Sequence, residues 1–316
     1  MSLRSLINAP IRWWRTPAIK RTIVVSVLVV TIGLFIHYFT QHPAYWHQLG
    51  TVSPWTVVWV LLLNALMVIV LTALGITTIA LCGRRISLRE NFLLTAYSSL
   101  ANFFGPLQSG PGVRAAYLKT RHQVRLRDYT LASLLVLGLY AFFSALFLLV
   151  GTRPWWQTTL VLLAVAGFSA YVIRFFQLRD KKRSESNLVL QPRILAAIVI
   201  LVFVQVVITV AWYYVELKAV NPHIRFSQAM SYAGAANFAL FVSITPDAVG
   251  IREGFLVLSQ HIHHVANKDI VSANVIDRAV YVVFLGLLFL LVLGMHAKDK
   301  LQLTKLRRQV ASGDEQ

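Results

Sequence analysis

Residues 97–114 read YSSLANFFGPLQSGPGVR, and residues 232–252 carry the related stretch YAGAANFALFVSITPDAVGIR. Each stretch opens with Tyr-x-x-x-Ala-Asn-Phe, passes through a segment with proline and glycine, and ends in Gly-x-Arg. Proline and glycine at this density stop a helix. The pattern therefore predicts two short helices, each followed by a sharp break that carries an arginine.

The similarity continues beyond the two breaks. Asp128 and Asp269 each precede an apolar stretch, and Leu-Phe-Leu-Leu-Val recurs in those stretches at residues 146–150 and 288–292. Apolar segments resemble one another by composition alone, but four matches in the same order indicate an internal repeat.

The composition is that of a polytopic membrane protein. Of the 316 residues, 57% are hydrophobic and only 13% are charged. In soluble domains, roughly a quarter of the residues are charged. This excludes an ordinary soluble enzyme and a disordered chain. The net charge of +18 is interpreted as cytoplasmic basic loops on anionic lipid, with no nucleic-acid partner. The single Cys82 excludes an internal disulfide and a cysteine zinc site.

A spanning helix needs about 20 mostly apolar residues. The first candidate follows a basic segment without a cleavage site, so it is interpreted as an uncleaved signal anchor. Residues 92–104 are too short to span, and residues 228–245 carry Gln, Ser, Gly and Asn. Six stretches qualify as spans: residues 22–39, 55–82, 129–150, 155–176, 194–215 and 273–295.

The distribution of basic residues distinguishes two topologies. If 92–104 and 228–245 both enter and leave on one face, most lysines and arginines lie on the cytoplasmic side. If both stretches span, the basic segments 105–128 and 174–193 move outside, against the positive-inside rule. We therefore expect an all-α membrane protein with six spanning helices, two re-entrant helical hairpins and both termini cytoplasmic.

This topology divides the chain into a basic cytoplasmic N-terminus, one membrane domain and a basic cytoplasmic tail. In the membrane domain the two copies of the repeat have opposite orientation, joined by span 155–176. An inverted repeat with broken helices is typical of transporters, in which one substrate site alternates between the two faces. The predicted boundaries are 1–21, 22–295 and 296–316, with repeats at about 55–150 and 194–295.

Arg114 and Arg252 occupy equivalent positions after the two breaks. A guanidinium offers a planar donor fork suited to phosphate, so each could hold a lipid phosphate partway across the membrane. Alternatively, Arg114 only begins the basic run 114–127, which reads as an interfacial helix on anionic lipid, and Arg252 pairs locally with Glu253.

Other polar residues within apolar segments are further candidates. Glu253 is a counter-ion or a proton-coupling carboxylate. Arg278, beside Tyr281, either faces the substrate cavity or forms a structural ion pair with Glu253 or Asp247, while Asp277 need not pair with its neighbour Arg278. Asn102 and Asn237 either contact substrate or hydrogen-bond to backbone freed by the breaks.

The breaks themselves are predicted to act as gates, with bare backbone N–H groups that could also cradle phosphate. His261, His263 and His264 form a cluster that we interpret as solvated or interfacial, without a metal. No catalytic or cofactor-binding motif is present, so we expect neither an enzyme nor a cofactor. The proposed tip residues are Gly105, Pro106, Gly110, Pro111, Gly112, Pro246, Asp247, Gly250 and Gly254.

The segment Pro-x-x-x-Gly-Ile-Arg-Glu-Gly at 246–254, followed by Asp-Arg-Ala-Val-Tyr at 277–281, resembles the lysylphosphatidylglycerol synthase transmembrane-region family. The resemblance covers about residues 20–300 and implies a lipid flippase. Fused synthases of this family carry a soluble aminoacyltransferase domain, but only about 20 residues follow the last predicted span here. We therefore expect a stand-alone member that does not aminoacylate lipid by that route. The Pro106–Gly112 tip also departs from a plainer glycine-rich tip.

The leading hypothesis is a translocase of a bacterial or archaeal inner membrane that moves an anionic phospholipid or a polyprenyl-phosphate-linked lipid. An accessory subunit of a separate glycosyltransferase or synthase is the main alternative, and it predicts co-purification with that partner. An intramembrane lipid-modifying transferase is the third, and it predicts a covalent change in lipid.

Overall fold

A computed structural model describes residues 52–104, 109–149, 188–189, 191–241 and 251–313, together with Thr40 and scattered positions between 156 and 174. In the last helix, side chains are described as far as His296. The chain divides into two compact units, Met1–His47 and Gln48–Gln316. All that follows concerns the second unit. The predicted span 22–39 lies outside the described residues, and 155–176 is described only at isolated positions.

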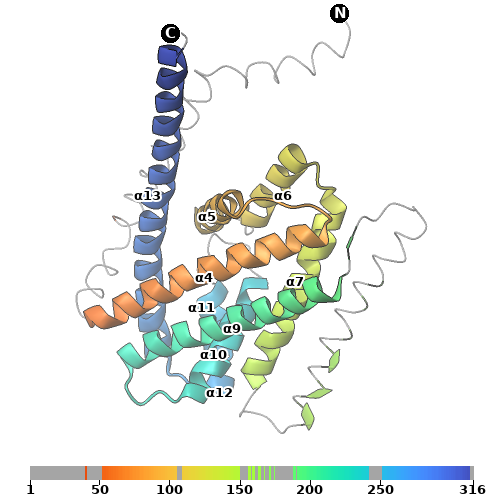
Figure 1. Cartoon of the computed structure of the whole chain (residues 1–316). Helices are drawn as coiled ribbons and strands as arrows, with labels where there is room; N and C mark the ends of the chain where they lie inside the picture. The colour runs from red at the N-terminus through yellow and green to blue at the C-terminus, as the bar shows by residue number, and fades with distance from the viewer. Residues whose placement is uncertain are drawn as a thin grey trace, which may run out of the picture. The chain divides into compact units, whose positions relative to one another are not determined.

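Every element in the described residues is a helix, and the helices form two runs of the same order: a long helix, two short segments and a long helix (Figure 1). The first run comprises α4 (Pro54–Leu81), α5 (Leu88–Phe104), α6 (Ser109–His122) and α7 (Leu126–Leu149). The second comprises α9 (Pro192–Val220), α10 (Phe226–Phe241), α11 (Ile251–Leu258) with α12 (Gln260–His263), and α13 (Asn267–Gly313).

Four described helices are long and apolar enough to cross a membrane: α4, α7, α9 and the Asn267–His296 part of α13. They correspond to four of the predicted spans. The short helices α5 and α10 have 17 and 16 residues, fewer than the about 20 that a span needs. Six spans and the orientation of the termini stay predictions.

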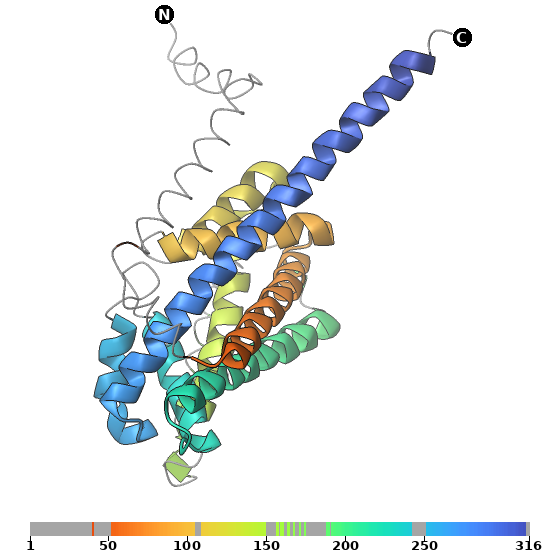
Figure 2. The ribbon, with the colours of Figure 1, turned by 90° about the vertical axis from the view of Figure 1, so that its left-hand side faces the viewer.

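Two helices extend beyond the predicted spans. Helix α9 continues to Val220, beyond the predicted end of the span at residue 215, because Lys218 and Glu216 are good helix formers despite their charge. Helix α13 begins at Asn267, before the predicted start of the span at residue 273, and runs without interruption to Gly313. Residues 296–313 of the predicted tail therefore continue the helix (Figure 2). Asp277 lies in the third turn of α13.

The predicted non-helical tips are also too long. Gly110, Pro111 and Gly112 lie in the first turn of α6, and Gly254 lies within α11. Proline is tolerated there because the first N–H groups of a helix have no partner within the helix. The rest of the proposed tip set lies outside the described residues: Gly105, Pro106, Pro246, Asp247 and Gly250.

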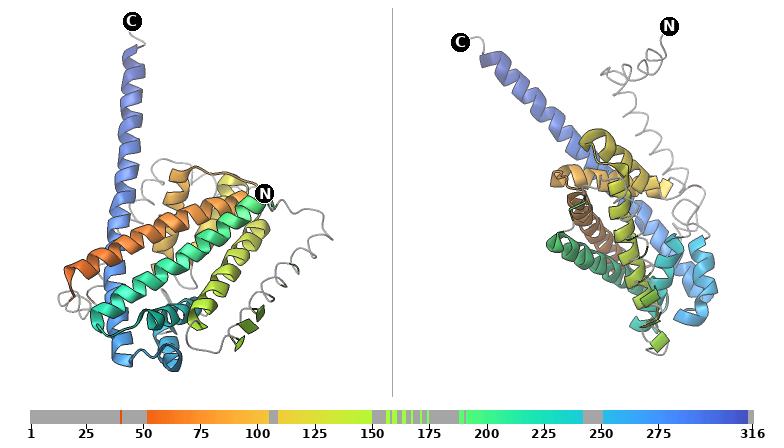
Figure 3. Two further views of the ribbon diagram at one scale, coloured as in Figure 1. Left: turned by 60° about the horizontal axis from the view of Figure 1, so that its bottom comes forward. Right: turned by 90° about the vertical axis from the view of Figure 1, so that its right-hand side faces the viewer.

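Equivalent long helices of the two runs point in opposite directions. Helices α4 and α9 pack side by side along their length and run antiparallel (Figures 1 and 3). In Figure 1, α7 descends while α13 rises. The apolar cores join the runs as well, because Ile198 and Val202 of α9 pack into the core of the first run. A smaller cluster places Val60 of α4 against Ile276 and Val280 of α13.

Candidate functional site

Two buried ion pairs join α11 to α13. The Arg252 guanidinium Nη2 lies 2.5 Å from Asp277 Oδ2, and the Arg278 Nη2 lies 2.7 Å from Glu253 Oε1. Consecutive residues on one helix thus pair with consecutive residues on the other, with the polarity reversed between the two pairs. Arg252, Asp277 and Arg278 are at most 6% exposed. The predicted pairing of Arg278 with Glu253 is confirmed, and Asp277 is the carboxylate that faces Arg252.

The cost of burying these charges indicates a role beyond stability. Removing a charge from water costs several kcal/mol, so a buried ion pair contributes little net stability. Ionisable residues inside a membrane are rare and are functional candidates by default. Here α11 positions Arg252 and Glu253 because Leu256, on the next turn, is anchored in the apolar core of the second run. We name the group Arg252, Glu253, Asp277 and Arg278 the paired cluster.

Glu216 on α9 is a further buried carboxyl beside the paired cluster, and the sequence analysis missed it. Its side chain is fully buried. Trp212 Nε1 donates to its Oε1 at 2.5 Å, while its Oε2 has no hydrogen-bond partner among the described residues. It interacts electrostatically with Asp277 and Arg252. A carboxyl within an apolar segment could have indicated this residue, but the predicted span ended at residue 215, one residue before Glu216.

A row of aromatic rings borders the paired cluster on one side. Arg252 Nη1 donates to the Tyr213 hydroxyl at 3.3 Å. The ring of Tyr213 lies 5.2 Å from that of Tyr232, which lies 5.3 Å from the imidazole of His263. These three side chains come from α9, α10 and α12. The row of rings therefore extends from the paired cluster to His263 at the end of α12.

Tyr281 joins the paired cluster to the first run. Its ring lies 5.7 Å from that of Phe103, near the end of α5, and 6.2 Å from that of Trp212. Because Tyr281 follows Arg278 by one turn on α13, the end of the first short helix lies beside the paired cluster. Of the seven predicted substrate contacts, the structure thus brings together Arg252, Glu253, Arg278 and Tyr281.

Arg114 lies elsewhere, among α4, α5 and α7. Its Nη2 donates to the Thr95 hydroxyl at 2.9 Å, and it interacts with the hydroxyl of Tyr129. A Cβ placed on Gly75 would lie 3.0 Å from its Nη1, so α4 passes directly beside the guanidinium. Within the described part of the chain, its hydrogen-bond partners are neutral and no carboxylate pairs with it.

The two candidate asparagines have different surroundings. Asn102 Oδ1 accepts a hydrogen bond from the Gly110 N–H at 2.7 Å, which confirms the structural alternative for this residue. Asn237 is buried and its Nδ2 donates to Ser144 Oγ on α7 at 3.2 Å. Neither asparagine lies in the paired cluster, so each holds short helices in place: Asn102 within the first run and Asn237 between the runs.

In each run, a polar side chain near the start of the first short helix bonds to the end of the second short segment. We call this contact the closed base of the run. In the first run, Tyr117 donates to Glu90 Oε1 at 2.5 Å, and the same oxygen lies 2.8 Å from His122 Nε2. The hydrogen bond from Tyr117, with further contributions from His122, lowers the pKa of Glu90 despite its partial burial. In the second run, Gln228 donates to the backbone oxygen of His264 at 3.0 Å. Glu90 and Gln228 are each the third residue of their helix.

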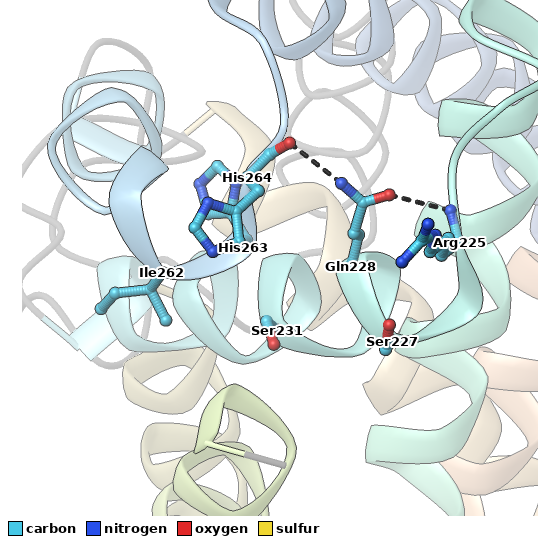
Figure 4. Close-up of a pocket in the computed structure, with 7 residues that line it drawn as sticks. All are labelled: Arg225, Ser227, Gln228, Ser231, Ile262, His263 and His264. Carbon is cyan, nitrogen blue, oxygen red and sulfur yellow. Dashed lines mark hydrogen bonds between the residues drawn. The ribbon is translucent and has the colours of Figure 1, made fainter. Parts of the chain in front are cut away.

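A polar pocket of about 340 Å³ opens at the base of the second run (Figure 4). Its lining residues are Arg225, Ser227, Gln228, Ser231, Ile262, His263 and His264. His261 and His264 are exposed, as predicted. The prediction of a solvated cluster is wrong for His263, which is fully buried. Its Nε2 contacts the Leu256 carbonyl and its Nδ1 accepts the Val265 N–H, so both ring nitrogens have backbone partners.

An apolar groove of about 510 Å³ lies between α4, α5 and α13. Phe92 and Phe284 line it, together with aliphatic side chains of α4 and α13. Phe284 follows Arg278 by six residues, which is roughly 9 Å along a helix. The groove therefore begins less than two turns from the paired cluster.

Comparison with known proteins identifies one family. The model of the family described as "Lysylphosphatidylglycerol synthase TM region" matches residues 23–288. No curated protein matches the chain. The matched range includes the paired cluster, Glu216 and Arg114.

Proposed function

The chain belongs to the lysylphosphatidylglycerol synthase TM region family, and on that basis we propose that it is a lipid translocase. It is a multi-pass membrane protein with a lipid-related role. The proposed substrate is an anionic, phosphate-bearing lipid, either a phospholipid or a polyprenyl-phosphate-linked lipid. The proposed location is the cytoplasmic membrane of a bacterium or archaeon. The lipid leaves chemically unchanged, so the protein acts as a carrier and not as an enzyme.

The observation that carries this proposal is the environment of Arg114. The guanidinium is held among neutral partners, Thr95 and Tyr129, and no carboxylate of the described residues neutralises it. A phosphate would supply that charge and accept hydrogen bonds from the guanidinium fork. The Thr95 hydroxyl already donates to the Asn91 carbonyl at 2.8 Å, so in this proposal the guanidinium itself supplies the hydrogen bonds to the phosphate.

The paired cluster supplies the second phosphate contact in this proposal. A phosphate that reaches Arg252 or Arg278 exchanges with Asp277 or Glu253 as the partner of the guanidinium. The nearby apolar groove, which begins with Phe284, suits the hydrocarbon tail of the same lipid, because tail burial is favourable without any polar contact.

Two related halves provide a mechanism of alternating access. The opposite directions of α4 and α9 and of α7 and α13 (Figure 1) support the predicted inverted repeat. In this proposal α5–α6 and α10–α11 are re-entrant hairpins that gate opposite faces, with non-helical backbone covered by protein. The contact between Phe103 and Tyr281 lets the position of one hairpin affect the cluster of the other half.

The test measures lipid movement in proteoliposomes that contain the purified full chain. The assay follows headgroup-labelled anionic, zwitterionic and polyprenyl-phosphate lipids. We expect selective movement of a phosphate-bearing anionic lipid, and a loss of at least about tenfold in Arg114→Gln, since one charge-assisted contact contributes about 1.5–3 kcal/mol. Arg121→Gln, on the exposed face of the same helix, is the matched control and should move lipid normally. Equal rates in both variants would refute the role of Arg114, and no movement of any lipid by folded wild-type protein would refute the translocase.

A further inference from the structure

Beside the paired cluster, Glu216 is a third carboxyl for only two guanidinium groups. Arg252 faces Asp277 and Arg278 faces Glu253. Glu216 has no cation within ion-pair distance among the described residues, and its Oε2 has no hydrogen-bond partner. It is nevertheless fully buried in the interior of a membrane protein. A buried group of this kind needs a physical explanation.

The surroundings of Glu216 disfavour a negative charge on it. Trp212 and Tyr213 flank it on α9, Arg252 approaches from α11 and Asp277 from α13. Tyr213 in turn contacts the ring of Tyr232 on α10 and interacts electrostatically with Tyr140 on α7. Helix α4 carries no titratable side chain. Arg252 is the one cation in this set, and it is engaged with Asp277. An ionised carboxyl without its own cation costs far more in such a place than the neutral acid.

From this geometry we propose that Glu216 is a proton-binding site that couples the movement of the lipid to the movement of protons. The proposal deepens the proposed function and rests on it. Among the described residues, three ionised carboxylates and two guanidiniums give the site one excess negative charge, and a bound lipid phosphate would raise that excess to two. A proton on Glu216 offsets the charge that the phosphate adds, so that the phosphate can occupy Arg252 while the freed Asp277 faces a neutral neighbour. The anionic lipid and the proton therefore bind together and travel in the same direction.

The polar pocket lies at the far end of the aromatic row from Glu216. His263 lines that pocket (Figure 4), and its ring contacts Tyr232, whose ring contacts Tyr213. Two tyrosine side chains thus separate the polar pocket from the paired cluster. Ser231, fully buried on the pocket wall, has a hydroxyl without a hydrogen-bond partner among the described residues. In this proposal, protons approach Glu216 from the side of this pocket.

The experiment imposes a pH gradient on proteoliposomes of the full chain that contain headgroup-labelled phosphatidylglycerol. One pH unit corresponds to about 1.4 kcal/mol per proton. Coupling of one proton to one lipid therefore predicts that the labelled lipid becomes about tenfold asymmetric between the leaflets per pH unit. An ionophore that collapses the gradient should abolish the asymmetry. The Glu216→Gln variant should still equilibrate lipid but should show no gradient-driven asymmetry.

Two further variants protect the test against misfolding of Glu216→Gln. Glu216→Asp retains a carboxyl and should retain the gradient response. Trp212→Phe removes the donor to Oε1 and keeps a smaller aromatic ring beside Tyr281, so it favours the neutral acid and should raise the pH at which transport is half-maximal. Wild-type protein that moves lipid but ignores the gradient would refute proton coupling alone. A gradient response that persists in Glu216→Gln would refute the assignment to this residue, and absence of all lipid movement would refute the proposed function as well.

Discussion

Arg278 on α13 and Glu253 on α11 form an ion pair at 2.7 Å, although Arg278 is only 3% exposed. The neighbouring residue on each helix, Asp277 and Arg252, forms a second pair of reversed polarity. Since the four charges lie on two adjacent helices, each pair sits in the field of the other. A ligand that takes one arginine therefore changes the energy of the whole cluster.

The paired cluster should behave as a unit in a double-mutant cycle. Asp277→Asn removes the carboxylate that faces Arg252, and breaking a buried pair from one side destabilises a protein by about 3–5 kcal/mol. We expect a comparable loss in Arg252→Gln. The double variant should lose much less than the sum, because neither charge is then left without its partner.

Thermal and denaturant unfolding of detergent-solubilised protein measures this cycle. Lys268→Gln, an exposed residue at the start of α13, provides the surface control and should change stability little. Strictly additive losses in the two single variants would show that Arg252 and Asp277 do not interact in solution.

Gly75 tests whether the position of Arg114 matters for transport. An added Cβ at Gly75 would lie 2.8 Å from the Asn91 side chain and 3.0 Å from Arg114 Nη1. Asn91 is buried and donates to the Thr72 carbonyl, so it cannot easily move aside. We expect Gly75→Ala to cost about 1–3 kcal/mol of stability by overpacking and to reduce lipid movement by displacing the guanidinium.

Gly294→Ala is the matched control for Gly75→Ala, because nothing lies within 4 Å of a Cβ at Gly294. Gly294 lies on α13, outside the proposed gates and the paired cluster, so the variant should leave both stability and lipid movement near wild type. A Gly75→Ala protein that moves lipid as fast as Gly294→Ala would show that the packing around Arg114 does not affect transport.

Much of this fold was predictable because apolar length and helix breakers are local properties of the sequence. Four spans and the two short helices follow from them. Helix ends were less predictable. Glu216 lay just outside the predicted span because a charged residue usually marks the end of an apolar segment, whereas here α9 buries it beside the paired cluster.

The partners of the charged residues could not be predicted with equal certainty. Glu253 was correctly weighed as a partner of Arg278, but the pairing of Arg252 with Asp277 depends on how α11 lies against α13. That placement is a tertiary property with no local sequence signal. The burial of His263 was missed for the same reason. Its two backbone partners, Leu256 and Val265, come within hydrogen-bonding distance of the ring only when the turn after α12 is formed.

The approach of α10 to α7 depends on Gly234. A Cβ there would lie 2.5 Å from the backbone nitrogen of Leu148 and 2.7 Å from its Cα. Since backbone atoms cannot rotate away, Gly234→Ala must separate the two helices and with them the contact between Asn237 and Ser144. We expect a loss at the upper end of the overpacking range, about 3 kcal/mol, in thermal unfolding.

Gly286→Ala on α13, where a Cβ meets nothing within 4 Å, should be neutral or slightly stabilising because alanine favours helices. If Gly234→Ala unfolded at the same temperature as Gly286→Ala, the close packing of α10 on α7 would be wrong.

The base of the first run should make stability depend on pH in the acid range. The pKa of Glu90 is lowered below its ordinary value of 4.5, chiefly by the hydrogen bond from Tyr117. A group whose pKa is lower in the folded state stabilises the protein above its unfolded value. That contribution is lost as the pH falls through the folded pKa. Stability should therefore decrease below about pH 4.5, partly because of this residue.

Glu90→Gln isolates this contribution, since it removes the titrating group but keeps the size of the side chain. The melting temperature of Glu90→Gln should fall below that of wild type at neutral pH, and the two should converge as the pH falls through the lowered folded-state pKa of Glu90. Tyr117→Phe should show a smaller effect of the same sign, because it removes the donor that most lowers the pKa of Glu90. If the Glu90 carboxylate made no contacts in the folded state, the difference in melting temperature between wild type and Glu90→Gln would be the same at all pH values. That result would contradict the contacts of Glu90 with Tyr117 and His122.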